Sequence, residues 1–360
     1  MSAGQQQASD GGPYVYLDPF LIRRRQVNLG LSQTQLVNAM CVAPNTAKAA
    51  FRGNAIHPDT ALRLAKQLKC DVTDLLAPRD PAYVAPASVN GPMAGASEWE
   101  TQECLESGRV ASNGLLSFSC QMQHRFIPSR QGRGKFYYFA LMSAKARSDI
   151  QEKLNRHAEV SARVGMHPNV SHNLTSTPAV GDAGWWIIDD WVGAFTLAEK
   201  LEHDAWPAAD LPRLLLDVSS GLQALHKAGV VFRELAPARV LIAEQDSRAV
   251  LTDFELAKLL DGSPSVSSEW PEDPYRAPEV DGGSATIQAD LYSVGKIALF
   301  AAAGKLVDHE SVPDVCNKAG VPKQLAKLLI ACLEPVPQKR PADLAPLLKE
   351  LTAWQKKAAR

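Results

Sequence analysis

A stretch of 18 residues, poor in charge, divides the chain into two parts. Residues 80–97 read DPAYVAPASVNGPMAGAS, in which Pro, Gly, Ala and Ser predominate and no charged residue follows Asp80. This composition is typical of an interdomain linker, because it offers no amphipathic face that could pack. The sequence therefore predicts two domains, residues 13–79 and residues 98–360, after a disordered start at residues 1–12.

The overall composition is that of an ordinary globular protein. Hydrophobic residues make up 46% and charged residues 21%, which excludes collagen-like and wholly disordered chains. The longest strongly apolar stretch, near residues 297–303, is far shorter than the roughly 20 residues that a membrane-spanning helix needs. The Gln-rich start lacks the apolar core of a signal peptide, so we expect a cytoplasmic protein without a membrane partner. The 6 cysteines form no CxxC pair and have no metal-ligand spacing.

Short helical patterns alternate with turn signals in the first part. Each of the first four predicted helices has a capping residue or a proline near its start and an apolar face, and a short fifth follows. The five starts are Pro19, Ser32, Pro44, Pro58 and Val72. Through residue 80 this part holds nine Lys and Arg against six Asp and Glu, whereas the remainder is slightly acidic. Only the first part therefore suits a polyanion.

The run from Leu31 to Leu76 resembles the helix-turn-helix domain of the Cro and phage-repressor (XRE-type) family. The resemblance implies that residues 13–79 form an all-α, five-helix domain whose recognition helix is residues 44–52. The implied contacts to base edges and phosphates of double-stranded DNA are Gln33, Asn45, Thr46, Lys48 and Arg52. A single module reads few base pairs, so DNA binding implies a homodimer. A five-helix protein-docking module with a solvated polar face is the alternative.

The larger part begins with strand-like runs and continues with helical ones. Residues 117–127 and 135–142 are rich in β-formers and are separated by Gly132 and Gly134, which predicts a hairpin that turns at these glycines. Because helical patterns dominate afterwards, we expect an α+β fold. Its small β lobe and large helical lobe are predicted at about residues 98–192 and 193–360.

Five short motifs follow one another in the larger part. They are Val230–Ile242, Asp253–Glu255, Tyr275–Glu279, Asp290–Gly295 and Gln338–Pro341. In this order they resemble the catalytic loop, the D-F-G segment, the A-P-E segment, the start of helix F and the late arginine of protein kinases. The resemblance implies a bilobal, protein-kinase-like fold. The residues that it assigns to the framework of that fold are Arg233, Phe254, Glu279, Asp290 and Arg340.

The resemblance places the strand of the phosphate-binding lysine at Phe139–Met142. Ala140 would then roof the adenine slot, and the thioether of Met142 would replace the ammonium. Lys135 lies seven positions from Met142, and an odd offset along a strand points to the opposite face, so Lys135 is not a ready substitute. Glu159 stands for the ion-pairing glutamate of helix C, without its partner.

The catalytic loop departs from the family pattern in the same direction. Glu234 stands at the position of the base aspartate, one methylene longer. Arg239 stands at the position of the metal-binding asparagine, which would put a fixed positive charge where a second Mg²⁺ should bind. Asp253 remains a candidate ligand for one metal ion, and Glu255 replaces the glycine two positions later.

Because the groups that handle phosphate and metal are mostly replaced, the sequence predicts a catalytically inactive kinase-like domain, a pseudokinase. The predicted function is a DNA-binding transcription regulator in which this domain senses a ligand or binds an unknown protein partner. Two alternatives stay open. One is an active, atypical serine/threonine kinase that uses Glu234 and Asp253, with the first domain for targeting; the other is a protein scaffold that binds no DNA. The candidate cofactor is ATP, with or without Mg²⁺.

Overall fold

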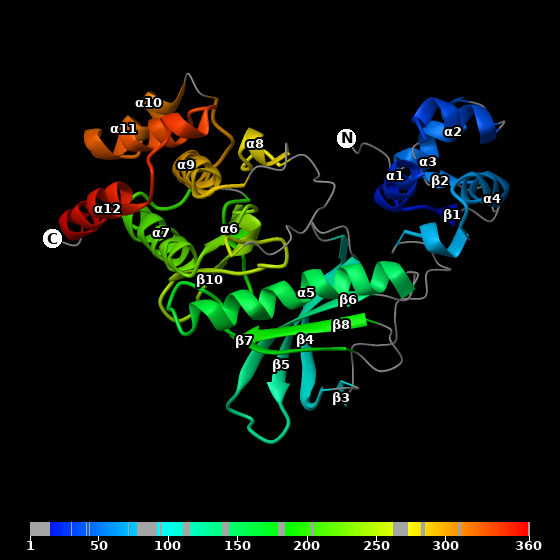
Figure 1. Ribbon diagram of the computed structural model, residues 1–360, viewed down its shortest axis with the longest axis horizontal. Helices are drawn as coiled ribbons and strands as arrows, with labels where there is room; N and C mark the ends of the chain where they lie inside the picture. The colour runs from blue at the N-terminus through cyan, green and yellow to red at the C-terminus, as the bar shows by residue number, and fades with distance from the viewer. Residues whose placement is uncertain are drawn as a thin grey trace, which may run out of the picture. The chain divides into compact units, whose positions relative to one another are not determined.

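The computed structural model describes most of the chain, and these residues are coloured in Figure 1. They are residues 15–29, 31–40, 42, 44–70, 72–77, 92–93, 96–110, 116–138, 144–178, 184–202, 205–261, 273–281, 285–308 and 311–358. The chain folds as two compact units, Met1–Ser88 and Val89–Arg360. Their boundary falls inside the predicted linker. Most of that linker, and the predicted disordered start, lie outside the described residues.

The first unit is a small helical body around an apolar core. Its elements are β1 (Val15–Tyr16), α1 (Pro19–Asn28), α2 (Gln33–Met40), α3 (Pro44–Phe51), β2 (Ala55–Ile56), α4 (Pro58–Gln67) and the 3-10 helix η1 (Val72–Leu75). Side chains from all four α-helices meet in the core, among them Ile22, Leu36, Ala50 and Leu64. The fifth predicted helix is only a 3-10 turn, and β1 pairs with β2, so the unit is not purely helical as predicted.

The second unit begins with an antiparallel sheet. Its strands are β3 (Pro92–Met93), β4 (Ala96–Val110), β5 (Leu116–His124), β6 (Gln131–Tyr138), β7 (Asn173–Pro178) and β8 (Gly184–Asp190), in the order β3-β4-β5-β6-β8-β7. Helix α5 (Ala144–Val164) leads from β6 to β7 and lies along the sheet (Figure 1). Tyr137, Trp185 and Ile187 of the sheet pack against Ile150 and Leu154 of α5, so one apolar stripe holds the helix in place.

β5 and β6 form the predicted hairpin, but its second strand begins and ends earlier than predicted. The strand predicted at residues 135–142 runs instead from Gln131 to Tyr138. Gly132 and Gly134, predicted as turn residues, lie inside this strand, and a Cβ on Gly134 would come within 2.2 Å of Sδ of Met122. Both glycines make room for neighbouring side chains, and in the sequence this requirement looks the same as a turn signal.

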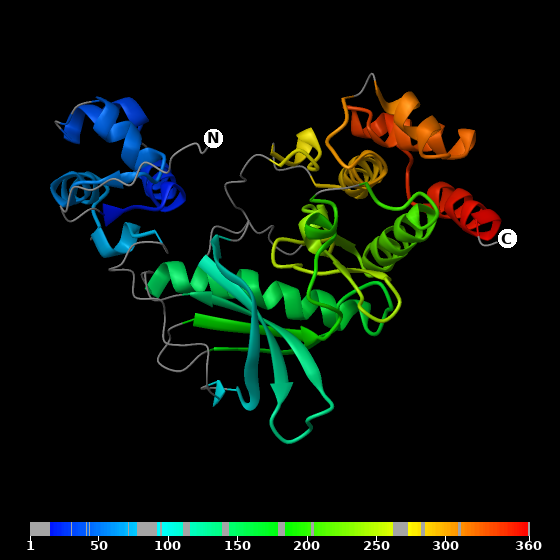
Figure 2. The ribbon, with the colours of Figure 1, turned by 180° about the vertical axis from the view of Figure 1, so that it is seen from behind.

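Helices dominate the rest of the second unit, as predicted, and Figures 1 and 2 show them grouped beside the sheet. They are α6 (Leu197–Lys200), α7 (Leu211–Lys227), α8 (Pro278–Asp281), α9 (Ile287–Ala303), α10 (Val312–Lys318), α11 (Lys323–Cys332) and α12 (Ala345–Ala358), with the 3-10 helices η3 (Pro237–Arg239) and η5 (Pro337–Lys339). The leucine stripe of α7, with Leu214, Leu222 and Leu225, enters a core shared with α9, α11 and α12. A small sheet part and a larger helical part fit a bilobal α+β fold.

Two short strand pairs flank the loops that carry the kinase-like motifs. They are β9 (Val230–Val231) with β12 (Lys258–Leu259), and β10 (Val240–Ile242) with β11 (Ala249–Leu251). Because β9, β10 and β11 are buried, the two pairs fix where the intervening loops begin and end. Across the coloured parts of Figure 1, none of the helices is both long and apolar enough to cross a membrane.

Candidate active site

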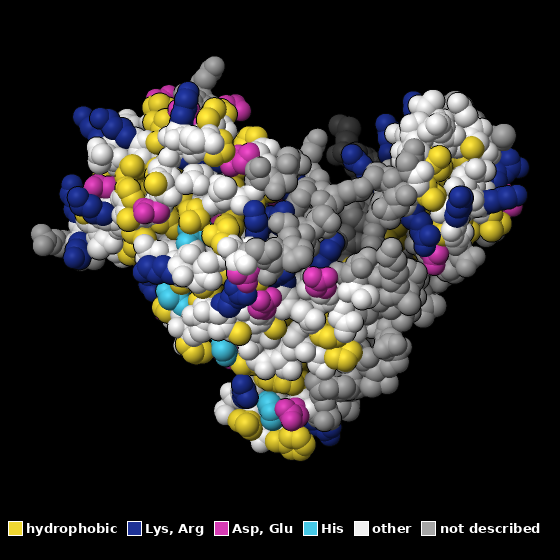
Figure 3. Space-filling view, viewed as in Figure 1, with side chains coloured by type: hydrophobic (Ala, Val, Ile, Leu, Met, Phe, Trp, Pro, Cys, Tyr) yellow, Lys and Arg dark blue, Asp and Glu magenta, His cyan; other side chains and the backbone are white. Residues whose placement is uncertain are grey.

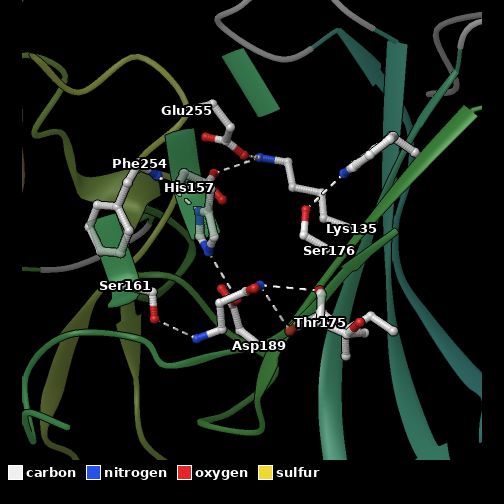
Figure 4. A network of polar contacts seen from close by, with 12 residues as sticks. Lys135, His157, Ser161, Thr175, Ser176, Asp189, Phe254 and Glu255 are labelled. Carbon is white, nitrogen blue, oxygen red and sulfur yellow. Dashed lines mark hydrogen bonds and ion pairs between the residues drawn. The ribbon is translucent and has the colours of Figure 1, made fainter. Parts of the chain in front are cut away.

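Lys135 lies in a group of charges between the sheet and the helical part of the second unit. Its Nζ is 2.7 Å from Oδ2 of Asp253 and 4.0 Å from Oε1 of Glu255 (Figure 4). Strand alternation explains its direction, because Lys135 shares a face of β6 with Tyr137, which packs towards α5. Only 18% of the Lys135 side chain and 24% of the Asp253 side chain are exposed. The ion pair therefore joins the sheet to the segment after β11.

These charges hold one another ionised. Burial lowers the pKa of Lys135, but Asp253 and Glu255 outweigh burial and raise this pKa above its ordinary value. Burial raises the pKa of Asp253, but Lys135 and Arg239 more than offset it, and the pKa falls to about 2. Both groups are therefore charged at neutral pH. The site offers an ammonium for phosphate oxygens beside a carboxylate for a cation.

The position of Lys135 corrects the prediction that this lysine points away from the site. The strand predicted at residues 135–142 puts Met142 in the site and Lys135 on the opposite face. That parity argument requires one continuous strand, whereas β6 ends at Tyr138. Met142 and Ala140 lie outside the described residues. The ammonium that reaches Asp253 belongs to Lys135.

Glu159 does not accompany Lys135. Its side chain is 45% exposed, and it lies 2.8 Å from Nη2 of Arg163 and 3.8 Å from Nη1 of Arg156, both on the same helix. The two carboxylates near Lys135 come from the Asp253 segment instead. Glu159 therefore pairs with arginines of its own helix, and the structure does not place it in the predicted role of ion-pairing glutamate.

The catalytic-loop motif is held in place by Asp290 of α9. The side chain of Asp290 is fully buried; Oδ1 accepts a hydrogen bond from the Arg233 amide at 2.7 Å, and Oδ2 accepts one from the Phe232 amide at 2.8 Å. Arg233 has a left-handed φ of 72°, which costs energy for a residue with a side chain. The bonds to Asp290 hold the loop in this conformation.

Glu234 and Arg239, the two substituted positions of this loop, form a buried ion pair. Nη2 of Arg239 lies 2.8 Å from Oε2 of Glu234, and Nη1 donates to the Glu234 carbonyl oxygen at 2.5 Å. The two side chains are 9% and 5% exposed. Burial lowers the pKa of Arg239, but Glu234, Asp253 and Glu255 outweigh it, so the predicted positive charge is present and faces a carboxylate.

The segment Asp253–Glu255 carries the other two carboxylates of the site. Asp253 has a φ of 65°, a left-handed conformation that Asp tolerates better than most residues. The hydroxyl of Tyr137 donates to Oε1 of Glu255. Burial raises the pKa of Tyr137 well above its ordinary value, and Glu255 raises it further, so the phenol keeps its proton. Glu255, at the family's glycine position, thereby links the segment to β6.

His157 of α5 also contacts this segment, although no motif singled it out. Its side chain is 1% exposed, Nε2 lies 2.9 Å from Oδ1 of Asp189, and Nδ1 accepts a hydrogen bond from the Phe254 amide at 3.2 Å. Figure 4 shows His157 between Phe254 and Asp189. The available signal in the sequence was slight: two polar residues one turn apart, His157 and Ser161, on the otherwise apolar face of a predicted helix.

Glu279 and Arg340 meet at the far end of the helical part. Nη1 of Arg340 donates to Oε1 of Glu279 at 2.6 Å, and Nη2 donates to Oε2 at 3.0 Å. The Arg340 side chain is fully buried. This two-pronged contact ties α8 to the residue that follows η5.

The residues predicted to contact DNA lie on the first unit. Gln33, Asn45, Lys48 and Arg52 are exposed, and Thr46 is half-buried. Their exposure agrees with a binding face and equally with a solvated one, so these contacts stay predictions. On the face of the second unit seen in Figure 3, Lys and Arg side chains lie among Asp and Glu side chains.

Asp253 is the residue that fits a divalent cation. Within the part of the chain that the structure describes, His, Cys, Asp and Glu do not gather in any group of three that could hold a metal. A single carboxylate suits Mg²⁺ that is bound mainly by phosphate oxygens and water. At position 239 the guanidinium repels a second ion. The residues therefore fit ATP with one cation and do not fit a second one at this loop.

A bilobal fold with a lysine–aspartate pair in its interior and an aspartate-anchored loop beside it defines a protein-kinase domain. The family model described as protein kinase domain matches residues 131–356. The chain belongs to the protein kinase family.

Named relatives are also serine/threonine-protein kinases. The chain is 31% identical over 288 residues to the probable serine/threonine-protein kinase pknA2 of Bifidobacterium longum, covering 72% of this chain and 38% of that protein. It is 30% identical over 177 residues to serine/threonine-protein kinase AfsK of Streptomyces coelicolor, which covers 44% of this chain and 22% of that protein. It is 23% identical over 207 residues to serine/threonine-protein kinase C of Synechocystis, which covers 53% of this chain and 38% of that protein. The chain thus spans well under half the length of these relatives.

These findings correct the predicted function. The prediction of a DNA-binding regulator with an inactive kinase-like domain is wrong, because the chain belongs to a kinase family and its relatives are named as kinases. The active-kinase alternative is the better interpretation. One obstacle to it was the missing ammonium, and the structure places the ammonium of Lys135 beside Asp253.

Proposed function

We propose that the second unit is an ATP-dependent protein kinase that phosphorylates serine or threonine hydroxyls. The observation that carries the proposal is the Lys135–Asp253 ion pair, 2.7 Å long, beside the catalytic-loop motif. Phosphoryl transfer is mainly positioning and charge stabilisation, and it needs a cation on the phosphates close to a carboxylate that binds metal. The names of the relatives support the choice of hydroxyl.

Lys135 is the residue that binds the phosphates in this proposal. Its ammonium contacts Asp253, and phosphate oxygens would take over part of that contact. Asp253 would hold one Mg²⁺, which neutralises charge on the phosphates when bound. Glu255 keeps a second carboxylate near the Lys135 ammonium, so the ammonium stays charged and directed into the site.

Glu234 is the residue that orients the acceptor hydroxyl in this proposal. It stands at the position of the family's base, and its side chain lies 2.8 Å from Nη2 of Arg239. Arg239 also places a permanent positive charge near Asp253 and Glu255. We propose that this charge serves where the family uses a second metal ion.

The helix-turn-helix assignment of the first unit stays a prediction. It is supported by the capping box that opens α2: the Ser32 amide donates to Oε1 of Gln35 at 2.7 Å, and the Gln35 amide donates to Oγ of Ser32 at 3.2 Å. It is also supported by the order of α2 and α3. Double-stranded DNA, a homodimer and a protein partner of the kinase unit are likewise predictions.

The proposal is tested by phosphate transfer from γ-labelled ATP, with Mg²⁺ or Mn²⁺, to the chain itself and to a library of Ser- and Thr-containing peptides. Asp253→Asn should lower incorporation by about 100-fold or more. Asp246→Asn is the matched control, because Asp246 is 47% exposed and its described contacts are with Arg213 and Arg248. The account fails if the chain and its Asp253→Asn variant incorporate the same background label with either metal.

A further inference from the structure

Arg133 reaches from the sheet to the segment that leads into the helical part of the second unit. Residues 191–196 form this segment, which joins β8 to α6. Nη1 of Arg133, on β6, donates to the carbonyl oxygens of Gly193 and Ala194 at 3.1 Å each, across 60 and 61 positions of sequence. A charged donor that bonds two carbonyl oxygens of one segment ties that segment to the sheet.

The connecting segment itself is bonded to the helical part. The Val192 carbonyl oxygen accepts a hydrogen bond from the Glu244 amide at 3.2 Å. The Phe195 carbonyl oxygen accepts one from the amide of Ile242, the last residue of β10, at 3.0 Å. A Cβ on Gly193 would come within 2.5 Å of the Ile242 carbonyl oxygen. The segment therefore lies against β10, and the two carbonyl oxygens between these bonds accept from the sheet.

Arg133 lies on the face of β6 that carries Lys135. Side chains alternate along a strand, so Arg133, Lys135 and Tyr137 share this face. Tyr137 is fully buried and packs against α5, so the face is filled on that side of Lys135. Arg133 is half-buried and lies on the other side. A nucleotide whose phosphates contact Lys135 therefore has its base and ribose on the side of Arg133.

We propose that Arg133 closes the end of the site that takes the base and ribose, and so determines how tightly the chain binds the nucleoside part of its nucleotide. The proposal rests on the proposed function for the place of the phosphates at Lys135. The family resemblance gave the nucleoside end to Ala140, two positions before Met142. With Lys135 in the place of Met142, the residue two positions earlier is Arg133. A guanidinium on its stem fills space that a methyl group leaves open.

The carboxylate opposite Arg133 in the sheet is engaged elsewhere. Arg133 and Asp189 are partners in the register of β6 and β8. However, Oδ1 of Asp189 lies 2.9 Å from Nε2 of His157 and accepts a hydrogen bond from Nδ2 of Asn173 at 3.0 Å. The guanidinium donates instead to the two carbonyl oxygens of the connecting segment. Neutral acceptors hold a guanidinium less strongly than a carboxylate does, so the contact can open and a nucleoside can take its place.

A closure of this kind lowers the affinity for nucleoside by a predictable factor. A site that is open for only a fraction of the time binds its ligand more weakly in proportion to that fraction. With the site open about one tenth of the time, adenosine binds about tenfold more weakly than it does to a permanently open site. Adenosine is the suitable probe because it carries no phosphate, so the loss of the Arg133 charge does not change its binding through attraction to phosphates.

The experiment is calorimetric titration of the full chain with adenosine, for the wild type, Arg133→Ala and Arg213→Ala. Arg213→Ala is the matched control, because Arg213 is 43% exposed and lies on α7. We expect Arg133→Ala to bind adenosine about tenfold more tightly than the wild type, and Arg213→Ala to bind it as the wild type does. Equal or weaker binding by Arg133→Ala, absence of measurable binding in all three proteins, or an equal gain in Arg213→Ala would overturn the proposal.

A second variant and a second measurement apply if Arg133→Ala does not fold. Arg133→Met keeps an unbranched stem but cannot donate to the two carbonyl oxygens, so it should also bind adenosine more tightly than the wild type. Hydrogen–deuterium exchange without nucleotide, read on peptides that cover residues 191–197, tests the contact itself. We expect exchange about fivefold faster in the Arg133 variant than in the wild type. Equal exchange would contradict the closure.

The closure and the proposed function can fail separately, because neither adenosine binding nor hydrogen exchange requires phosphate transfer. Tighter adenosine binding by Arg133→Ala in a chain that transfers no phosphate would sustain the closure and remove the proposed function. Phosphate transfer by a chain whose Arg133→Ala variant binds adenosine no more tightly would remove the closure alone.

Discussion

Nζ of Lys135 and Oδ2 of Asp253 lie 2.7 Å apart, although 118 positions separate the two residues in the sequence. One residue comes from the central part of the sheet and the other from the loop that leaves β11. Their contact requires both parts of the second unit to be assembled. The pair is therefore a folding contact and, in the proposed function, the part of the site that receives ATP phosphates.

Asp253 should make stability depend on pH in the acid range. The pKa of Asp253 is about 2 in the folded chain against an ordinary value of 3.8. The ionised carboxylate therefore contributes fully to the free energy of unfolding above the unfolded-state pKa, and this contribution is lost as the pH falls through the folded-state pKa. The shift corresponds to about 2 kcal/mol at neutral pH, and roughly half of it should remain at pH 3. Urea unfolding of the chain and of Asp253→Asn measures it by tryptophan fluorescence, because all 7 tryptophans lie in the second unit. A difference that is constant from pH 7 to pH 3 would contradict this prediction.

Replacing Arg239 alone should lower the free energy of unfolding strongly, and replacing it together with Glu234 should lower it much less. In Arg239→Met a buried carboxylate that is 5% exposed loses its cation, which typically costs about 3–5 kcal/mol. In Glu234→Leu with Arg239→Met both charges disappear, so the loss should be smaller than the sum of the single losses by at least about 2 kcal/mol. Fluorescence-monitored unfolding of Arg239→Met, of Glu234→Leu and of the double variant completes the cycle. Additive losses would show that the ion pair does not couple the two residues.

Arg340 should not be replaceable by lysine. The guanidinium donates to both oxygens of Glu279 and, through Nε, to the Glu334 carbonyl oxygen at 2.7 Å, and an ammonium cannot reproduce this fork. We expect Arg340→Lys to lower the free energy of unfolding by about 2 kcal/mol. Arg213→Lys is the control: Arg213 is 43% exposed and lies 3.5 Å from Asp246, so it should change stability by about 0.5 kcal/mol or less. Equal losses in the two variants would refute the prediction.

The sequence could predict the parts of the fold that depend on local order and spacing. The four α-helices of the first unit, the predominance of helices late in the second unit, the β5–β6 hairpin and the order of the kinase-like motifs follow from capping residues, apolar periods and motif order. The ends of β6 could not be predicted in this way, because Gly132 and Gly134 serve close packing in the sheet and also look like turn residues. That error placed the strand four residues too late, so the prediction put Met142 at the site where the structure has Lys135.

The contacts made by α5 could not be predicted from local patterns either. A helix pattern gives its apolar stripe, but the polar partners of His157 come from β8 and from the segment after β11, 32 and 97 positions away. Glu159 has the residue type that the family motif expects, but it lies on a face of the helix where it pairs with Arg163 and not with Lys135. Such choices depend on tertiary packing, which a single sequence does not display.

The central claim is that Lys135 provides the phosphate-binding cation. Calorimetric titration of the full chain with ATP and with adenosine, for the wild type, Lys135→Met and Lys200→Met, tests it most directly; Lys200 is an exposed lysine next to Phe195. We expect Lys135→Met to weaken ATP binding by about tenfold or more while adenosine binding stays unchanged, and Lys200→Met to alter neither. If Lys135→Met binds ATP as tightly as the wild type does, Lys135 is not that cation.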